Sequence, residues 1–261
     1  ASQDSTYKGV APEIKGFVDI VTFNRHGGAM VSWCLEALDI AYKEAKQIQG
    51  PVVSTNSWGG PPIDTPEFNE LREAALKLAD EIPVVFAAGN SGPGSRTICS
   101  PGDADKEGNE IITVGAVDKS NNIAWFSSRG PDNWGSDRNE PDISAPGVNV
   151  VSSVPGGQRS ASGTSMAAPH VAGTIALMLS KNPQLSNQEC LDILMKSARD
   201  AGSPGFDYAY GAGIIQADKA VALTPAGVPQ VPAVVWQAAA VISLLIGLML
   251  AVNPEVVARG G

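Results

Sequence analysis

The stretch SGTSMAAPHVAG, residues 162–173, passes from a loop of small residues directly into a helical pattern. Ser165 would lie in the first turn of that helix, where the helix dipole and unpaired backbone N–H groups favour negative charge. Gly163 would leave room for backbone or another molecule to approach closely. These features suit an exposed nucleophile, and they also suit a serine that only caps the helix.

Apolar runs alternate with helical patterns on the N-terminal side of this stretch, and a second helical pattern follows it. Short runs rich in Val, Ile and Phe predict buried strands, and apolar residues spaced three or four apart predict helices. This alternation is typical of an α/β fold with a mostly parallel sheet and helices on both faces. We expect strands at 17–23, 51–56, 82–88 and 111–117, and helices at 30–49, 67–81, 165–180 and 187–196.

The composition excludes several classes of protein. With 43% hydrophobic and 17% charged residues, the chain is not disordered throughout. The net charge of −9 and the lack of any basic block argue against nucleic-acid binding. Cys34, Cys99 and Cys190 lack the spacing of a zinc site, and two of them could pair in an oxidising compartment. The sequence does not say which two.

Six further motifs occur in a fixed order around residues 162–173. They are GVAP (9–12), SWGG (57–60), FAAGNSGPG (86–94), FSSRGP (126–131), PDISAPGVNVVSS (141–153) and YGAGIIQADKAV (210–221). Together they resemble the subtilisin-like serine proteases over residues 7–221. The resemblance implies a subtilisin-like α/β fold that hydrolyses peptide bonds through an acyl-enzyme intermediate on serine.

The resemblance also implies roles for individual residues. Ser165 corresponds to the nucleophile, and the side chain of Asn90 corresponds to the donor that stabilises the oxyanion. Trp58 stands where the family often has leucine, which leaves the size of the substrate pocket open. The residues expected to contact a polypeptide substrate are Gly27 and Gly28 in an edge strand, Ser57, Trp58, Gly59, Ala87, Ala88 and Gly89 in the two pocket walls, and Gly163 and Thr164 beside the nucleophile.

The partners that a catalytic serine needs are harder to find. Such a serine requires a base, and the base requires an orienting carboxylate. The chain has two histidines. His170 projects about 140° around the helix from Ser165, so it cannot be the base and is expected to pack. His26 lies beside the expected edge strand, and the family's Asp-bearing and His-bearing motifs are absent.

Three explanations remain for this incomplete catalytic set. In the first, another chain or segment supplies the Asp and the His; in the second, the protein is an inactive pseudoprotease that acts as a binding or structural subunit. In the third, His26 serves as the base. We expect the first, because Ser165 and Asn90 are both present. The sequence begins without Met or an apolar signal segment, so we also expect a processed or partial chain, incomplete at the front of the sheet.

The C-terminal region differs from the rest of the chain. Residues 1–223 are expected to form the peptidase domain and residues 224–233, with three prolines, a semi-rigid stalk. Residues 234–252 carry no charge and are long enough to span a bilayer as a helix, followed by a tail at 253–261. A buried core helix is the alternative. The expected location is a single-pass membrane protein with its peptidase domain on the extracytoplasmic side.

The reaction implied by the resemblance requires no cofactor. Calcium is common in the family as a structural ion, and Asp103, Asp105, Glu107 and Glu110 form an acidic cluster that could bind it. A solvated surface loop is the alternative, and the sequence favours it over calcium binding. The metal content is therefore left open.

Overall fold

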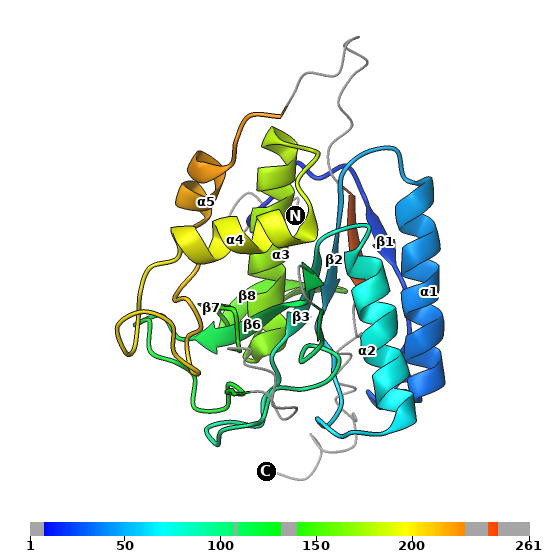
Figure 1. The fold of residues 1–261 in the computed structure, drawn as a ribbon, viewed down its shortest axis with the longest axis horizontal. Helices are drawn as coiled ribbons and strands as arrows, with labels where there is room; N and C mark the ends of the chain where they lie inside the picture. The colour runs from blue at the N-terminus through cyan, green and yellow to red at the C-terminus, as the bar shows by residue number, and fades with distance from the viewer. Residues whose placement is uncertain (1–7, 107–108, 132–139, 228–239, 245–261) are drawn as a thin grey trace.

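A six-stranded sheet forms the centre of the computed structural model, which describes residues 8–106, 109–131, 140–227 and 240–244 (Figure 1). Its strand order is β1-β10-β2-β3-β6-β7, and every neighbouring pair is parallel. The strands are β1 (Phe17–Asp19), β2 (Val52–Asn56), β3 (Val84–Ala87), β6 (Ile112–Val117), β7 (Ile143–Pro146) and β10 (Ala240–Leu244).

Helices cover both faces of this sheet, as the sequence predicts. On one face lie α1 (Val31–Gln47) and α2 (Pro66–Ala79). On the other lie α3 (Thr164–Lys181), α4 (Asn187–Ser197) and α5 (Ala217–Leu223) (Figure 1). The four expected helices and four expected strands are all confirmed, although β1 ends four residues earlier than expected.

The central strands are apolar on both sides because each side faces a layer of helices. In β2, Val52 belongs to the core under α1 and α2, whereas the adjacent Val53 belongs to the core under α3. Phe86 and Val85 of β3 divide in the same way. Successive side chains of a strand point to opposite faces, so a sheet covered on both faces requires continuous apolar runs.

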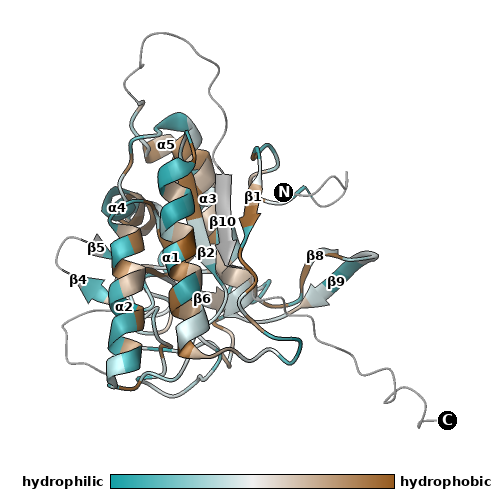
Figure 2. Cartoon of the chain, turned by 90° about the vertical axis from the view of Figure 1, so that its right-hand side faces the viewer, coloured by the Kyte–Doolittle hydropathy of each residue, from teal (hydrophilic) through white to brown (hydrophobic). Residues whose placement is uncertain are grey.

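Two small antiparallel sheets were not predicted. One pairs β4 (Asp105–Lys106) with β5 (Asn109–Glu110), and the other pairs β8 (Val150–Val154) with β9 (Gly157–Ala161). The β8–β9 hairpin projects from the main body (Figure 2). Its turn is Pro155-Gly156, and Gly156 and the first residue of β9, Gly157, both have positive φ. A Pro-Gly pair between two short runs is a turn signal, and it could have identified this element.

The structure corrects the helix expected at 234–252. Residues 240–244 form β10, inserted between β1 and β2, with Val241 in register with Phe17 and Val53. The rest of 234–252 and most of the stalk lie outside the described residues. A short apolar run containing Val and Ile suits a strand, and periodicity alone cannot separate it from a helix. In the described part of the chain, no helix is both long and apolar enough to cross a membrane.

Candidate active site

Ser165 lies in the first turn of α3, just beyond the carboxyl end of β2. Its hydroxyl Oγ donates to the backbone carbonyl of Ser57, 3.1 Å away, and the Ser57 hydroxyl donates to the Ser165 carbonyl at 2.9 Å. Two residues 108 positions apart in sequence are thus joined by a reciprocal pair of hydrogen bonds. This pair of hydrogen bonds fixes the start of α3 against the end of β2.

A proline inside α3 explains one of these bonds. In a regular helix the carbonyl of Ser165 would accept from the N–H of residue 169, which here is Pro169 and has no N–H. A buried carbonyl without a partner is costly. The Ser57 hydroxyl supplies the missing donor. Pro169 therefore leaves the Ser165 carbonyl without its helical donor, and the Ser57 hydroxyl takes that place. The proline is visible in the sequence, so the need for an outside donor could have been predicted.

Asn90 is held beside Ser165 by Thr164. The side-chain oxygen Oδ1 of Asn90 accepts from the Thr164 N–H at 2.9 Å and from the Thr164 hydroxyl at 3.2 Å. The same hydroxyl accepts from the Gly89 N–H at 3.1 Å. Because Oδ1 is engaged twice, the amide orientation is fixed. The NH2 group of Asn90 and the N–H of Ser165 make no hydrogen bonds within the described residues, so both donors remain available.

Gly163 allows this arrangement to form. Its φ of +155° lies in a region that side chains with a Cβ rarely adopt. Its N–H donates to the Gly147 carbonyl at 2.8 Å, which ties the start of α3 to the segment after β7. A Cβ at Gly163 would lie 3.6 Å from both polar atoms of the Asn90 amide. The glycine thus leaves the space in front of Asn90 open.

A cavity of about 400 Å³ opens beside these groups. It lies at the carboxyl ends of β2 and β3, where sites form in sheets of this kind. Seven of the residues expected from sequence line it: Trp58, Gly59, Ala87, Gly89, Asn90, Thr164 and Ser165.

The comparison with protein families is decisive at this point. A family model described as the Subtilase family matches residues 1–213. The chain belongs to the subtilase family. The serine protease AprX of Bacillus subtilis (strain 168) is 36% identical over 251 residues, covering 85% of this chain and 54% of AprX. Subtilisin DY of Bacillus licheniformis is 38% identical over 216 residues, covering 81% of this chain and 70% of that protein.

The fold comparison agrees with the sequence comparison. The solved structure of Sphericase superposes with a TM-score of 0.65 and 28% sequence identity, covering 75% of this chain and 66% of that one. The chain spans about half the length of AprX. The relatives are therefore subtilisin-type serine proteases, and the roles of individual residues in this subtilase rest on its own geometry.

Trp58 lines the cavity, and its ring packs in the core. The residue is 5% exposed, and the ring Nε1 donates to the side-chain oxygen of Asn56 at 3.2 Å. The ring packs edge-on against Phe86 with ring centroids 5.1 Å apart, and against Phe23 at 6.2 Å. These contacts hold the ring in the core under α1 and α2.

Cys99 lines the same cavity and was not among the expected site residues. Its thiol donates to the Ala87 carbonyl at 3.2 Å. A Cβ at Gly59 would collide with the sulfur, and a Cβ at Gly89 would lie 3.3 Å from it. The sulfur thus fills the space between the two glycine walls. Burial, followed by the nearby carboxylates of Asp103 and Glu140, raises the pKa of Cys99 to about 12.

Gly27 and Gly28 do not lie in the extended edge strand that the resemblance implied. They belong to a tight turn in which Asn24 Oδ1 accepts from the N–H groups of His26 and Gly28 at 2.9 and 3.2 Å. The N–H of Asn24 donates to the Gly28 carbonyl at 3.0 Å, and Gly27 has φ +76°. The asparagine side chain, free to bond its own backbone, favours this turn over a strand.

The remaining expected residues lie near the site without lining the cavity. Ser57 bonds to Ser165, and Ala88 is fully buried, with its N–H donating to the Val114 carbonyl at 2.9 Å. Gly163 is a direct neighbour of the Asn90 amide, and none of these three residues lines the cavity.

Neither histidine contacts the nucleophile candidate. His170 Nδ1 lies 2.8 Å from the Met166 carbonyl, one turn back on its own helix. His26 is exposed, and its Nε2 accepts from the side chain of Arg25 at 3.1 Å. In the part of the chain that the structure describes, Ser165 Oγ bonds to a backbone carbonyl and to no histidine.

The described members of the acidic cluster at 103–110 have different surroundings. Asp103 is 2% exposed and pairs with Arg72, whereas Asp105 lies exposed on β4. Glu107 lies outside the described residues. Among the residues that are described, no group of three or more acidic, His or Cys side chains could hold a metal ion.

Proposed function

We propose that this subtilase carries the nucleophile and the oxyanion-binding donors of a serine endopeptidase. The observation that carries the proposal is the convergence of three groups on one cavity: Ser165 Oγ, the Ser165 N–H and the amide of Asn90. A nucleophilic oxygen beside two fixed N–H donors can attack a peptide carbonyl and stabilise the oxyanion that forms.

The proposed reaction has two stages. Ser165 Oγ bonds to the peptide carbonyl carbon as a base takes its proton, and the tetrahedral oxyanion accepts from Asn90 and the Ser165 N–H. Collapse breaks the C–N bond, and the base returns the proton to the amine that leaves. Water then attacks the acyl-enzyme by the same route, which restores Ser165 and releases the new carboxyl group.

We propose that the base and its orienting carboxylate come from a segment outside this sequence. Neither histidine bonds to Ser165 in the described residues, while Pro169, Ser57, Thr164 and Gly163 still hold the nucleophile and oxyanion geometry together. No cofactor takes part in this chemistry. Structural calcium stays a separate prediction, tested by the effect of EGTA on the thermal unfolding temperature.

Labelling with a fluorophosphonate tests the proposal. The full chain is tested alone and together with the segment that supplies the base, which we call the native assembly. It is compared with Ser165→Ala and with a control, Ser120→Ala, which changes an exposed serine distant in sequence from Ser165. We expect labelling of the native assembly that Ser120→Ala keeps and Ser165→Ala abolishes. Labelling that does not depend on Ser165 would exclude this serine as the nucleophile.

A pseudoprotease is the second candidate, favoured by the lack of any histidine bonded to Ser165. In this role the cavity binds a polypeptide without cleaving it. Peptide binding by a native assembly that never labels at Ser165 would favour this candidate over the endopeptidase.

The membrane location also stays a prediction. It rested on an apolar stretch of which residues 240–244 form a strand and the rest is not described. Extraction of membranes with alkaline carbonate tests it. Release of the protein into the soluble fraction would argue against a membrane-spanning anchor.

A further inference from the structure

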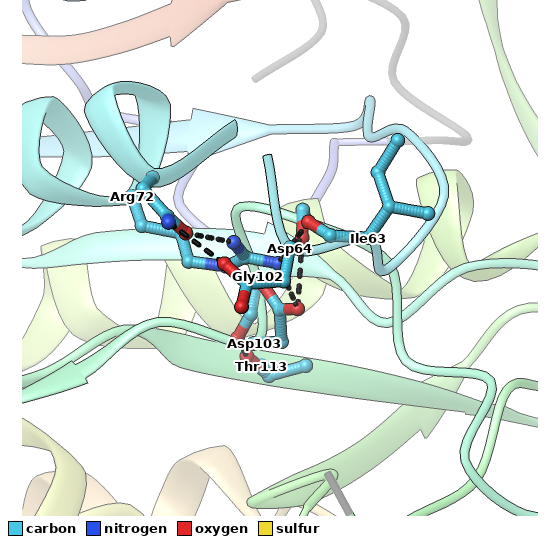
Figure 3. A network of polar contacts seen from close by, with 8 residues as sticks. Ile63, Asp64, Arg72, Gly102, Asp103 and Thr113 are labelled. Carbon is cyan, nitrogen blue, oxygen red and sulfur yellow. Dashed lines mark hydrogen bonds and ion pairs between the residues drawn. The ribbon is translucent and has the colours of Figure 1, made fainter. Parts of the chain in front are cut away.

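A buried ion pair lies directly behind the proposed substrate cavity. Arg72 of α2 pairs with Asp103, and their side chains are 11% and 1% exposed (Figure 3). Arg72 Nε donates to Asp103 Oδ1 at 3.0 Å, and Nη2 donates to Oδ2 at 2.9 Å. The planar guanidinium thus binds the carboxylate through two parallel bonds, a geometry that lysine cannot reproduce.

The same guanidinium reaches two of the segments that adjoin the cavity lining. Nη2 also donates to the hydroxyl of Ser100 at 2.5 Å and to the carbonyl of Ile63 at 3.3 Å. Cys99 and residues 60–62 line the cavity. Ser100 directly follows Cys99 in the chain, and Ile63 directly follows residue 62. One side chain therefore ties two separate parts of the cavity wall to helix α2.

Other bonds make this connection rigid. The Ser100 hydroxyl donates to Asp103 Oδ2 at 2.8 Å, so it bonds to both members of the ion pair. The backbone of Ser100 exchanges two hydrogen bonds with Gly60, at 2.8 and 3.1 Å. Displacement of Ser100 would move Cys99, whose sulfur fills the space between Gly59 and Gly89.

The energetics favour a geometric role for the pair. A buried ion pair contributes little net stability compared with apolar residues of similar size, because both charges lose their hydration. Its fixed geometry can nevertheless specify one arrangement of the loops around it. Because Arg72 also bonds to Ser100 and Ile63, the fixed geometry of the pair holds the segments that line the cavity.

We propose that Arg72 is a positioning residue that fixes the part of the substrate pocket lined by Cys99, and with it the size of the side chain that the pocket accepts. This inference rests on the proposed function, because it takes the cavity to be the site that receives the residue before the cleaved bond. The Cys99 sulfur narrows the pocket between Gly59 and Gly89 while Arg72 holds Ser100, so a pocket with Arg72 in place favours short side chains.

The test measures binding of four N-acetylated tetrapeptides to the full chain. The peptides differ only in a C-terminal Gly, Ala, Leu or Phe, and binding is followed by calorimetry. Arg72→Lys keeps the positive charge but not the planar guanidinium. Ser100→Ala leaves the ion pair and the bond to Ile63, but it removes both bonds that the Ser100 hydroxyl makes to the pair. Lys46→Met removes an exposed ion pair with Glu81 at the last turn of α1, and it serves as the control.

In the unmodified chain and in Lys46→Met, we expect the Ala peptide to bind more tightly than the Phe peptide. In Arg72→Lys and Ser100→Ala, the ratio of these two dissociation constants should fall by about tenfold, the scale on which pocket size discriminates side chains. Ser165 in the native assembly should still be labelled in both variants, which a general loss of structure would not allow.

An unchanged ratio in Ser100→Ala, with labelling retained, would overturn the role of Arg72 and leave the proposed function standing. If Arg72→Lys does not fold, Ser100→Ala alone decides. If the native assembly neither labels at Ser165 nor binds any of the peptides, both the proposed function and this inference fail.

Discussion

The hydroxyl of Thr164 offers a direct test of how the oxyanion site is held. In Thr164→Val the shape of the side chain is kept, but the bond to Asn90 Oδ1 and the acceptor for the Gly89 N–H are both lost. Thr164 is fully buried. Each such bond contributes about 0.5–1.5 kcal/mol, so the free energy of unfolding should fall by about 1–3 kcal/mol.

Urea unfolding measures this loss. If the m-value is about 2 kcal/mol/M, a loss of about 2 kcal/mol lowers the midpoint by about 1 M. Thr164→Ser is the matched control, because it keeps the hydroxyl and loses only a methyl group. In the double-mutant cycle with Asn90→Ala, we expect a coupling energy of about 1 kcal/mol between the two side chains.

Labelling of Ser165 in the native assembly measures the functional consequence. Removing an oxyanion donor outright typically lowers kcat by about 10²–10³-fold. In Thr164→Val, Asn90 keeps its bond to the Thr164 N–H, so labelling should slow by about tenfold, whereas Thr164→Ser should label normally. A valine variant with normal labelling and a normal urea midpoint would refute the reasoning that the hydroxyl orients Asn90.

Three further predictions concern stability. Trp58→Leu loses the edge-on contact with Phe86 and the Nε1 hydrogen bond, so the free energy of unfolding should fall by about 2 kcal/mol. The rate of Ser165 labelling should not change. Slower labelling would show that the ring belongs to the active site. In Gly147→Ala, a Cβ would lie 2.6 Å from Ala116 Cβ and 2.8 Å from the carbonyl oxygen of Gly163, so overpacking should cost about 1–3 kcal/mol in urea unfolding. Burial raises the pKa of Cys190 to about 12 from an ordinary value of 9.0, so only the unfolded chain ionises this thiol between pH 9 and pH 12. The free energy of unfolding should therefore be constant with respect to this group below pH 8 and fall above pH 9 by up to about 1.4 kcal/mol per pH unit, a fall that Cys190→Ala reduces.

The strands and helices of the main sheet could be predicted because their signals are local. The helix at 31–47 ends just before Gly50-Pro51, and the buried strands read as short apolar runs bounded by turn residues. The β8–β9 hairpin was missed because its strands are exposed and carry no apolar alternation. Residues 240–244 were assigned to a helix because an apolar run does not reveal its partners, and β10 exists only through its pairing with β1 and β2.

The sequence alone determined the family, the alternating α/β order, and the candidate pair of Ser165 and Asn90, because these depend on residue types at fixed positions along the chain. Tertiary structure decided how they are used. It turned the Trp58 ring into the core, closed Gly27 and Gly28 into a turn, brought Cys99 between two glycine walls, and tied the cavity to Arg72. These outcomes depend on contacts between distant segments, for which a linear pattern has no signal.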